Sequence, residues 1–335
     1  MTMIRFEDGS LVISSDSESA YTEDLFVYDP RTKQFRAKAS SYREYILRLT
    51  EKKKTYTDQA KAYKKLDLSL QAPLDPRVHQ KDALSAWMKS KQGVVVLPTG
   101  SGKTILAVLA MSQVGRSTLV VVPTIDLMHQ WKEVLSVFFS QPIGLLGGGE
   151  SSYEDIMVAT YDSARLMIES KGNRFGLLIA DECHRLPSSQ NRLVAEACIA
   201  PFRLGLTATV ERQDGAEELL YEIMGDLVYE AKIKDMVDCV LAPYDVIRIN
   251  VNLSESETKE YKESRLLYTN FLRANRINFS YPGAWQQFVM RSSQSSSGRE
   301  AFNAYQRQKK IPQWAEEKFS RLWDLLCEHA DDSLI

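Results

Sequence analysis

One stretch of the sequence carries the residue types needed to hold a polyphosphate. Residues 93–104 begin with an apolar run, turn through small residues and end in Gly102, Lys103 and Thr104, directly before a helical segment. Glycine lets backbone N–H groups approach phosphate oxygens, Lys103 supplies a positive charge, and the Thr104 hydroxyl can reach Mg²⁺. The order strand, glycine-rich turn and helix predicts a phosphate-binding loop, although Leu97 stands where the general pattern has its first glycine.

A second apolar run, residues 177–180, ends in a pair of acids, Asp181 and Glu182, with His184 close behind. Asp181 at a strand tip can hold Mg²⁺ directly or through water, and Glu182 is then placed to orient or deprotonate an attacking water. Such a pair can also be a solvated acidic turn. Downstream of a phosphate loop, however, it predicts the Walker B arrangement of a nucleotide hydrolase.

Two further groups of polar residues fit a nucleotide site. The Gln80 amide, which follows Arg77 at the start of a helical stretch, offers a donor and an acceptor that suit the edge of adenine. Without the other motifs Gln80 is an ordinary residue on a helix surface. Thr207 and Thr209 place hydroxyls after another apolar run, where they can hydrogen-bond toward the acids and relay the state of the nucleotide.

Hydroxyls and turns also follow two other apolar runs, at Pro123 and Thr124 and at Thr160 and Tyr161. Neutral donors at strand ends can bind a nucleic-acid phosphate backbone. The alternative is a simple turn from strand to helix, and the residues leave both interpretations open.

The spacing of the apolar runs predicts the fold that positions these groups. Between residue 77 and about residue 240, strand-like runs alternate with helical stretches, which indicates a parallel sheet with helices on both faces. The expected strands are residues 93–97, 118–122, 156–160, 176–180 and 202–206. Ligands of such sheets bind at the carboxyl ends of the strands. Since each polar motif follows one of these runs, we expect the motifs to meet along one edge.

Shorter patterns flank this α/β region and suggest boundaries at residues 1–70, 71–242 and 243–335. The first region contains a hairpin signal at Asp8-Gly9, a strand at residues 25–28 and a helix at residues 42–49. Its lysine-rich stretches are either a solvated face or a nucleic-acid contact. The last region predicts one strand, several amphipathic helices and one serine-rich loop: residues 244–251, 256–276, a helix from 285, one around 302–305, one at 319–326, and the loop at 292–297.

The composition limits the classes of protein that remain. The 42 basic and 44 acidic residues leave a net charge of −2, so any nucleic-acid affinity must come from local basic patches. The four cysteines form no C-x-x-C pair, which argues against structural zinc and a disulfide framework and fits a reducing cytosol. With no apolar run long enough for a bilayer and no signal-like segment, we expect a cytoplasmic protein without membrane association.

The ordered motifs P-R-x-x-Q, L-P-T-G-S-G-K-T, V-V-P-T, T-Y-D-S-A, D-E-C-H and L-T-A-T resemble those of superfamily 2 helicases. The finer similarity is to the xeroderma pigmentosum B (XPB) helicase family, archaeal or bacterial type. The resemblance implies a RecA-like P-loop domain, preceded by a small α+β domain of the damage-recognition type and followed by a helical thumb-like insertion. The element at residues 211–215 resembles the family's Arg-Glu-Asp element, except that Gln213 replaces the glutamate.

The resemblance also implies a role for individual residues. Those expected to bind ATP are Arg77, Gln80, Thr99, Gly100, Ser101, Gly102, Lys103 and Thr104. Thr104 and Asp181 would hold Mg²⁺, with Glu182 as the catalytic base beside Asp181 and Lys103. The residues expected to contact duplex or forked DNA are Pro123, Thr124, Thr160, Tyr161, Arg212 and Asp214. Those expected to couple the nucleotide to motion are His184, Thr207 and Thr209.

One expected part of such an enzyme is not recognised in the sequence. Members of the family have a second RecA-like domain that supplies an arginine finger, and nothing after residue 243 matches its Q-R-x-G-R signature. The chain stops at residue 335, where the family begins that domain's core. An arginine finger contributes about 10³ to 10⁵ in turnover, so we expect this polypeptide alone to bind ATP but hydrolyse it poorly. It would be a fragment, a split gene product, or a chain completed by a partner.

The sequence thus predicts the N-terminal half of an ATP-dependent DNA helicase or translocase, 3′–5′ by resemblance, of the DNA repair or transcription type. A C-terminal RecA-like domain or a partner nuclease would be its protein partner. Two alternatives remain: a non-catalytic DNA-binding scaffold that uses ATP as a structural switch, and the translocating subunit of a restriction system.

Overall fold

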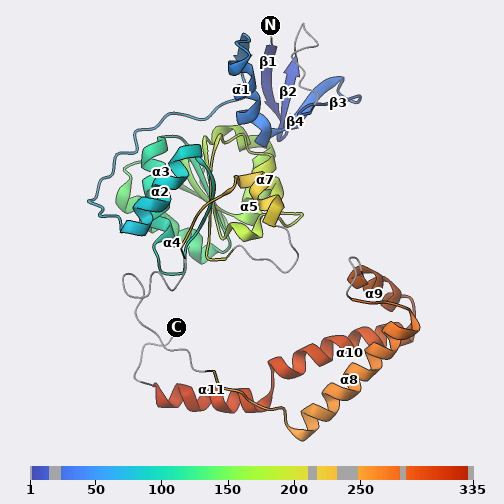
Figure 1. The fold of residues 1–335 in the computed structure, drawn as a ribbon. Helices are drawn as coiled ribbons and strands as arrows, with labels where there is room; N and C mark the ends of the chain where they lie inside the picture. Colours follow the sequence, from blue (N-terminus) through green and yellow to red (C-terminus); the bar gives the residue numbers. More distant parts are fainter. Residues whose placement is uncertain (1, 15–23, 210–216, 232–247, 280–283, 331–335) are drawn as a thin grey trace. The chain divides into compact units, whose positions relative to one another are not determined.

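The computed structural model describes residues 2–14, 24–209, 217–231, 248–279 and 284–330 (Figure 1). The chain divides into two compact units, residues 1–243 and 244–335. The described part of the first unit contains two β-sheets and their helices, and the described part of the second is built from helices.

The first unit begins with a small lobe formed by a five-stranded sheet in the order β3-β4-β2-β1-β5. Its elements are β1 (Thr2–Glu7), β2 (Ser10–Ser14), β3 (Val27–Asp29), β4 (Gln34–Lys38), a 3₁₀ turn η2 (Ala39–Ser41), α1 (Tyr42–Glu51) and β5 (Tyr56–Asp58). The predicted hairpin turn lies at Asp8 and Gly9, both with positive φ, between β1 and β2. β5, which the sequence did not indicate, pairs in parallel with β1.

The large lobe of the first unit is an eight-stranded sheet in the order β13-β6-β12-β11-β7-β10-β8-β9. Its strands are β6 (Gln92–Val96), β7 (Thr118–Val122), β8 (Ile143–Gly147), β9 (Glu150–Ser151), β10 (Ile156–Thr160), β11 (Leu177–Asp181), β12 (Phe202–Thr207) and β13 (Leu227–Glu230). All neighbouring pairs are parallel except β8 and β9. The predicted α/β class is therefore confirmed, and the five predicted strands coincide with β6, β7, β10, β11 and β12 to within one residue at either end.

Helices cover both faces of this sheet (Figure 1). One face packs against α2 (Val78–Ser90), α3 (Lys103–Val114) and α4 (Ile125–Phe138), and the other against α5 (Tyr161–Lys171), α6 (Arg192–Glu196) and α7 (Glu217–Met224). The strands are continuous apolar runs because both faces are buried. Successive residues alternate between the two cores: Val95 and Leu97 lie in the first, Val94 and Val96 in the second.

The small and large lobes share part of their cores. Ile199, in the loop before β12, is fully buried within the core cluster of the small lobe, beside residues of β1, β2 and α1. Arg43 on α1 donates hydrogen bonds to the carbonyl oxygens of Ser90 (2.6 Å) and Pro201 (3.1 Å). Leu68, in the segment between β5 and α2, packs into the core of the large lobe. The loop before β12 is therefore attached to the small lobe by the buried Ile199 side chain and by the Arg43 hydrogen bond to Pro201.

The described part of the second unit consists of α8 (Glu255–Ala274), α9 (Ala284–Ser293), α10 (Ser296–Gln313) and α11 (Glu316–Glu328). Phe288 is the fully buried centre of an aromatic cluster between α8, α9 and α10. This cluster also includes Phe271, Phe302 and Tyr305. α11 has no buried residue.

Two predictions for this unit are wrong within the described residues. Residues 248–251, the described part of the predicted strand at 244–251, have no regular secondary structure. The predicted serine loop at 292–297 shortens to Gln294 and Ser295, because α9 continues to Ser293 and the Ser295 hydroxyl caps α10 by accepting from the Gly298 N–H at 2.9 Å. Residues 332–335 lie outside the described residues. Among the described helices, none is both long and apolar enough to span a bilayer.

We predict that Ile199→Ala lowers the free energy of unfolding by about 2–5 kcal/mol, because it leaves a cavity in a core shared by two lobes. Urea unfolding followed by circular dichroism measures the change. Leu166→Ala is the control, since Leu166 is 84% exposed on α5 and its truncation should change stability by less than about 0.5 kcal/mol. Equal effects of the two substitutions would contradict the shared core.

Candidate nucleotide-binding site

The predicted phosphate loop connects β6 to α3 at the carboxyl edge of the large sheet. Gly100 and Gly102 have φ of +78° and +85°, which only glycine adopts without strain. Lys103 is the first residue of α3, and its ammonium lies 3.5 Å from the Leu97 carbonyl oxygen and 3.6 Å from a carboxylate oxygen of Glu182. The cation thus lies over the loop, at the positive end of the α3 dipole.

Two buried side chains hold this loop from inside. The Ser101 hydroxyl donates to the Pro98 carbonyl oxygen at 2.7 Å. The Gln80 amide nitrogen donates to the carbonyl oxygens of Ser101 (3.0 Å) and Gly102 (3.3 Å), and its oxygen accepts from the Arg77 N–H (2.9 Å). A Cβ at Gly102 would collide with this amide. The loop conformation therefore depends on Gln80.

These contacts describe the surroundings of Gln80, whose recognition of adenine stays a prediction. Its side chain is only 3% exposed, and both amide hydrogens and the amide oxygen already have backbone partners. In this structure the Gln80 side chain positions the phosphate loop through hydrogen bonds to its backbone. The backbone of Arg77 takes part in the same arrangement through its N–H. Thr99 and Gly100 lie exposed at the tip of the loop.

Asp181 ends β11, which β12 separates from β6 in the sheet order, and its carboxylate is almost fully buried. One carboxylate oxygen accepts from the indole N–H of Trp131 at 2.9 Å and the other accepts from the Glu182 N–H at 3.1 Å. Burial raises the pKa of Asp181 above its usual range, and these hydrogen bonds together with the charge of Lys103 oppose that shift. A cation placed next to this carboxylate would therefore relieve a desolvated charge.

Glu182 follows in a left-handed conformation, with φ +48° and ψ +50°. Its carboxylate lies 3.4 Å from the Thr207 hydroxyl and 3.4 Å from His184 Nδ1. His184 Nδ1 also lies 2.9 Å from the Thr207 hydroxyl, which donates to the Thr209 carbonyl oxygen at 2.7 Å. The structure thus brings the predicted acid, histidine and threonines into one hydrogen-bonded group, joined to Lys103 through Glu182.

The residues predicted to contact DNA have different positions. Thr124 is exposed and caps α4 by accepting from the Leu127 N–H, and Pro123 beside it is half-buried. Thr160 is buried and caps α5. The Tyr161 side chain is also buried, and its hydroxyl donates to the Asp181 carbonyl oxygen at 2.8 Å. The Tyr161 side chain therefore exposes almost no surface for a direct DNA contact in this conformation.

Arg212 and Asp214 lie outside the described residues, as does Gln213. Within the lysine-rich stretches, Lys61 pairs with Asp58 at 3.4 Å and Lys64 with Asp155 at 2.9 Å.

Two residues of the site were missed by the sequence analysis. His79 Nε2 lies 2.9 Å from the Ser101 carbonyl oxygen, next to the contact that Gln80 makes. Trp131 reaches Asp181 from the middle of α4. His79 could have been found from its place beside Gln80. Trp131 has the pattern of an ordinary core residue, since it is 2% exposed on the apolar face of α4.

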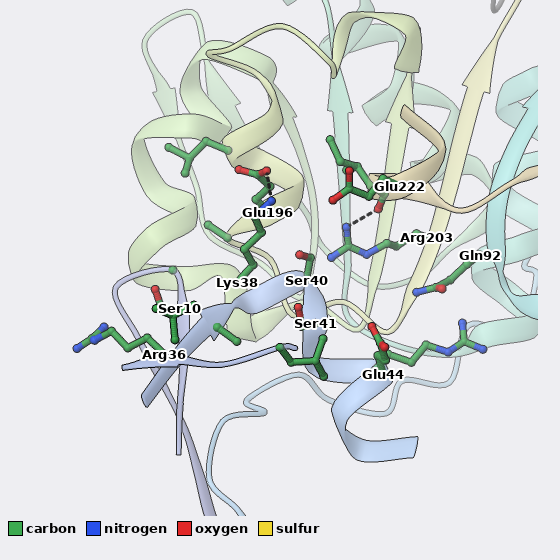
Figure 2. A pocket seen from close by; sticks show the side chains of 18 of the residues that line it. Ser10, Arg36, Lys38, Ser40, Ser41, Glu44, Gln92, Glu196, Arg203 and Glu222 are labelled. Carbon is green, nitrogen blue, oxygen red and sulfur yellow. Dashed lines mark hydrogen bonds and ion pairs between the residues drawn. The ribbon is translucent and has the colours of Figure 1, made fainter. Parts of the chain in front are cut away.

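A cleft of about 930 Å³ lies elsewhere, between the small lobe and the amino ends of the large-sheet strands (Figure 2). Figure 2 shows Lys38 from the small lobe near Glu196 of the large lobe, an ion pair of 2.9 Å. On the cleft floor, the buried Arg203 guanidinium donates to three carbonyl oxygens, those of Cys198, Ala200 and Ile223. Since these cations are already engaged by the protein, we interpret the cleft as a joint between lobes.

Comparison with known proteins gives two family matches. Residues 4–60 match the xeroderma pigmentosum group B helicase damage recognition domain, and residues 73–212 match the type III restriction enzyme res subunit. The "DNA 3'-5' translocase XPB2" of Sulfurisphaera tokodaii is 37% identical over 262 residues, which cover 78% of this chain and 60% of that protein. The "DNA 3'-5' helicase XPB" of Mycobacterium tuberculosis is 32% identical over 197 residues, covering 55% of this chain and 36% of that protein.

Among solved structures, the Hef helicase domain of Pyrococcus furiosus matches with 23% identity and a TM-score of 0.41, over 59% of this chain and 46% of that one. This chain spans no more than about 60% of the length of the two curated relatives that it matches.

The left-handed backbone at Glu182 leads to a prediction about stability. Glu182→Gly and Glu182→Ala both remove the carboxylate, but only alanine keeps a Cβ, which costs about 1–2 kcal/mol in this conformation. We therefore expect the glycine variant to be the more stable by about 1 kcal/mol, measured by urea unfolding. At Leu166, inside α5, the same pair of substitutions should give the opposite order. If the alanine variant at position 182 is as stable as the glycine variant, the left-handed backbone at this position is not strained by a Cβ.

Proposed function

Because this chain belongs to the XPB family of superfamily 2 DNA helicases, matching its N-terminal half, we propose that it acts in an ATP-dependent DNA translocase of the repair or transcription type. The observation that carries the proposal is the group formed by Lys103, Glu182 and Thr207 at the carboxyl edge of the parallel sheet. A cation and a carboxylate beside a phosphate loop are among the parts that nucleoside triphosphate hydrolysis needs. The 3′–5′ direction is taken from the names of the relatives.

In the proposed site, the backbone of residues 99–104 and the Lys103 ammonium bind the phosphates of ATP. Thr104 and Asp181 would hold Mg²⁺, since hydroxyl and carboxylate oxygens are donors that Mg²⁺ accepts when phosphates and waters complete its shell. When bound, Mg²⁺ neutralises charge on the phosphate oxygens. Glu182 accepts a proton from, or orients, the attacking water, and its carboxylate lies 3.4 Å from both the Thr207 hydroxyl and His184 Nδ1.

His184 and Thr209 make this site sensitive to the position of neighbouring strands. The Thr207 hydroxyl contacts both residues, and Thr207 lies on β12 whereas His184 follows β11. We propose that this group relays nucleotide state to the rest of the protein. Full hydrolysis would require an arginine finger from a second RecA-like domain, supplied in the same polypeptide or by a partner.

For DNA, we propose that the turns at the ends of β7 and β10 contact the phosphate backbone. Exposed Thr124 and the first N–H groups of α4 and α5 are available as neutral donors. The small lobe, which matches the damage recognition domain, would add a second contact. The restriction-type alternative shares the matched region 73–212, but the match at residues 4–60 favours the XPB assignment.

The nucleotide site is tested by Lys103→Ala. Because a charged hydrogen bond to phosphate is worth about 1.5–3 kcal/mol, we expect affinity for a fluorescent ATP analogue with Mg²⁺ to fall about 10–100-fold. Lys89→Ala, which removes an exposed lysine from α2, should leave affinity unchanged. Unchanged affinity of the Lys103 variant would remove the site assignment. DNA-dependent ATP turnover that Lys103→Ala abolishes would favour the translocase over the non-catalytic scaffold.

DNA binding through phosphate contacts should depend steeply on salt, because each contact releases condensed counterions. We expect affinity for a forked duplex, measured by fluorescence anisotropy, to fall at least about tenfold between 50 and 200 mM KCl. A logarithmic plot of affinity against salt with no slope would contradict backbone recognition. An identical titration with a shuffled duplex of the same length should give the same slope, since such contacts carry no sequence information.

A further inference from the structure

Asp181 is hydrogen-bonded by side chains from two different helices. The indole N–H of Trp131, on α4, donates to a carboxylate oxygen at 2.9 Å, and the hydroxyl of Tyr161, on α5, donates to the carbonyl oxygen at 2.8 Å. Both donors are buried, Trp131 at 2% and Tyr161 at 4% exposure. The carboxylate and the peptide group of one residue are thus fixed from opposite faces of the sheet, because α4 and α5 cover different faces.

Each of these helices begins at a turn that the proposed function assigns to DNA. α4 starts after its cap Thr124 and α5 after its cap Thr160, at the ends of the neighbouring parallel strands β7 and β10. Tyr161 is the first residue of α5, and Trp131 lies seven residues after the α4 cap, about 10 Å along the helix. A rigid helix carries a displacement of its first turn to such a residue.

The hydrogen bonds of Asp181 leave its carboxylate able to bind a cation and to change its orientation. Each carboxylate oxygen accepts one hydrogen bond, from Trp131 or from the Glu182 N–H, so each keeps a lone pair for a cation or its water. Removing the indole donor would leave one buried oxygen without this partner and let the carboxylate turn. Removing the Tyr161 donor would loosen the peptide that joins Asp181 to Glu182.

We propose that Trp131 and Tyr161 are positioning residues that transmit DNA binding from the first turns of α4 and α5 to Asp181, so that DNA raises the affinity for Mg²⁺-ATP. This proposal rests on the proposed function and concerns regulation of the same site. In this proposal, the coupling between DNA binding and nucleotide binding depends on the Trp131 and Tyr161 hydrogen bonds to Asp181. Substitutions can remove these two hydrogen bonds one at a time.

The experiment measures the coupling without requiring turnover. The affinity of the full chain for a fluorescent, non-hydrolysable ATP analogue with Mg²⁺ is determined with and without saturating duplex DNA, and the ratio is the coupling factor. We expect wild type to show a factor of about 5 or more, the lower end of typical coupling between sites. Tyr161→Phe keeps the ring and loses only the donor, whereas Trp131→Phe keeps an aromatic ring but loses the donor and part of the indole volume. Each should reduce the factor at least about threefold.

Trp87→Phe is the matched control. Trp87 is a fully buried tryptophan on α2 in the same core, and its indole N–H donates to the Arg203 carbonyl oxygen at 2.8 Å, away from Asp181. It therefore loses the same kind of hydrogen bond and the same ring volume as Trp131→Phe. We expect it to retain the wild-type coupling factor, and thermal melting checks that the variants are folded. If Trp131→Phe does not fold, Tyr161→Phe alone decides.

The outcomes separate the proposal from the function on which it rests. A wild-type chain that binds neither the analogue nor DNA would refute the proposed function. A wild-type chain that binds both with a coupling factor of one would refute only the coupling. Wild-type coupling in folded Trp131→Phe and Tyr161→Phe, or an equal loss in Trp87→Phe, would also overturn the assignment, because the two hydrogen bonds would then have no specific role.

Discussion

The in-register parallel ladder of β6, β12, β11 and β7 is the constraint on which the rest of the structure depends. Asp181 on β11 pairs with Leu206 on β12, and Thr207 pairs with Val96 on β6, one residue before the phosphate loop begins. Parallel hydrogen bonding brings the carboxyl ends of all four strands to one edge. The phosphate loop, the Asp181–Glu182 pair and Thr207 are far apart in sequence. They meet at this edge because the pairing of their strands brings them there.

Burial of both sheet faces explains why this edge could be predicted from sequence and its detailed contacts could not. Runs such as Thr118–Val122 and Ile156–Thr160 are buried throughout and apolar except for one terminal threonine each. Their bounds could therefore be recognised in the sequence, and the motifs that follow them had to converge. β8 contains glycine at Gly144 and Gly147 and β13 is short and partly exposed, so neither stands out as a strand. Within the site, the partner of a buried donor depends on tertiary packing, which periodicity does not encode.

Gln80 and Trp131 illustrate this limit in opposite directions. Gln80 was predicted as a residue of the site from its type and place, but its hydrogen bonds to the loop backbone were not predicted. Trp131 was indistinguishable from core, yet its single polar atom contacts the acid of the site. In both cases the residue type fixed what bonds were possible, and only the fold decided which bond formed. Buried polar groups must find partners, so such assignments are decided by proximity.

The position of Ile199 has a consequence for how proteins of this architecture can be rearranged. Ile199, between α6 and β12 of the large lobe, completes the hydrophobic interior of the small lobe, and Arg43 of the small lobe donates a hydrogen bond to the carbonyl oxygen of Pro201. The small lobe is therefore not a self-contained cassette. Recombination that moved residues 1–60 into another scaffold would transfer a lobe with an apolar opening. Such exchanges would succeed only where the recipient offers an aliphatic side chain at the same place.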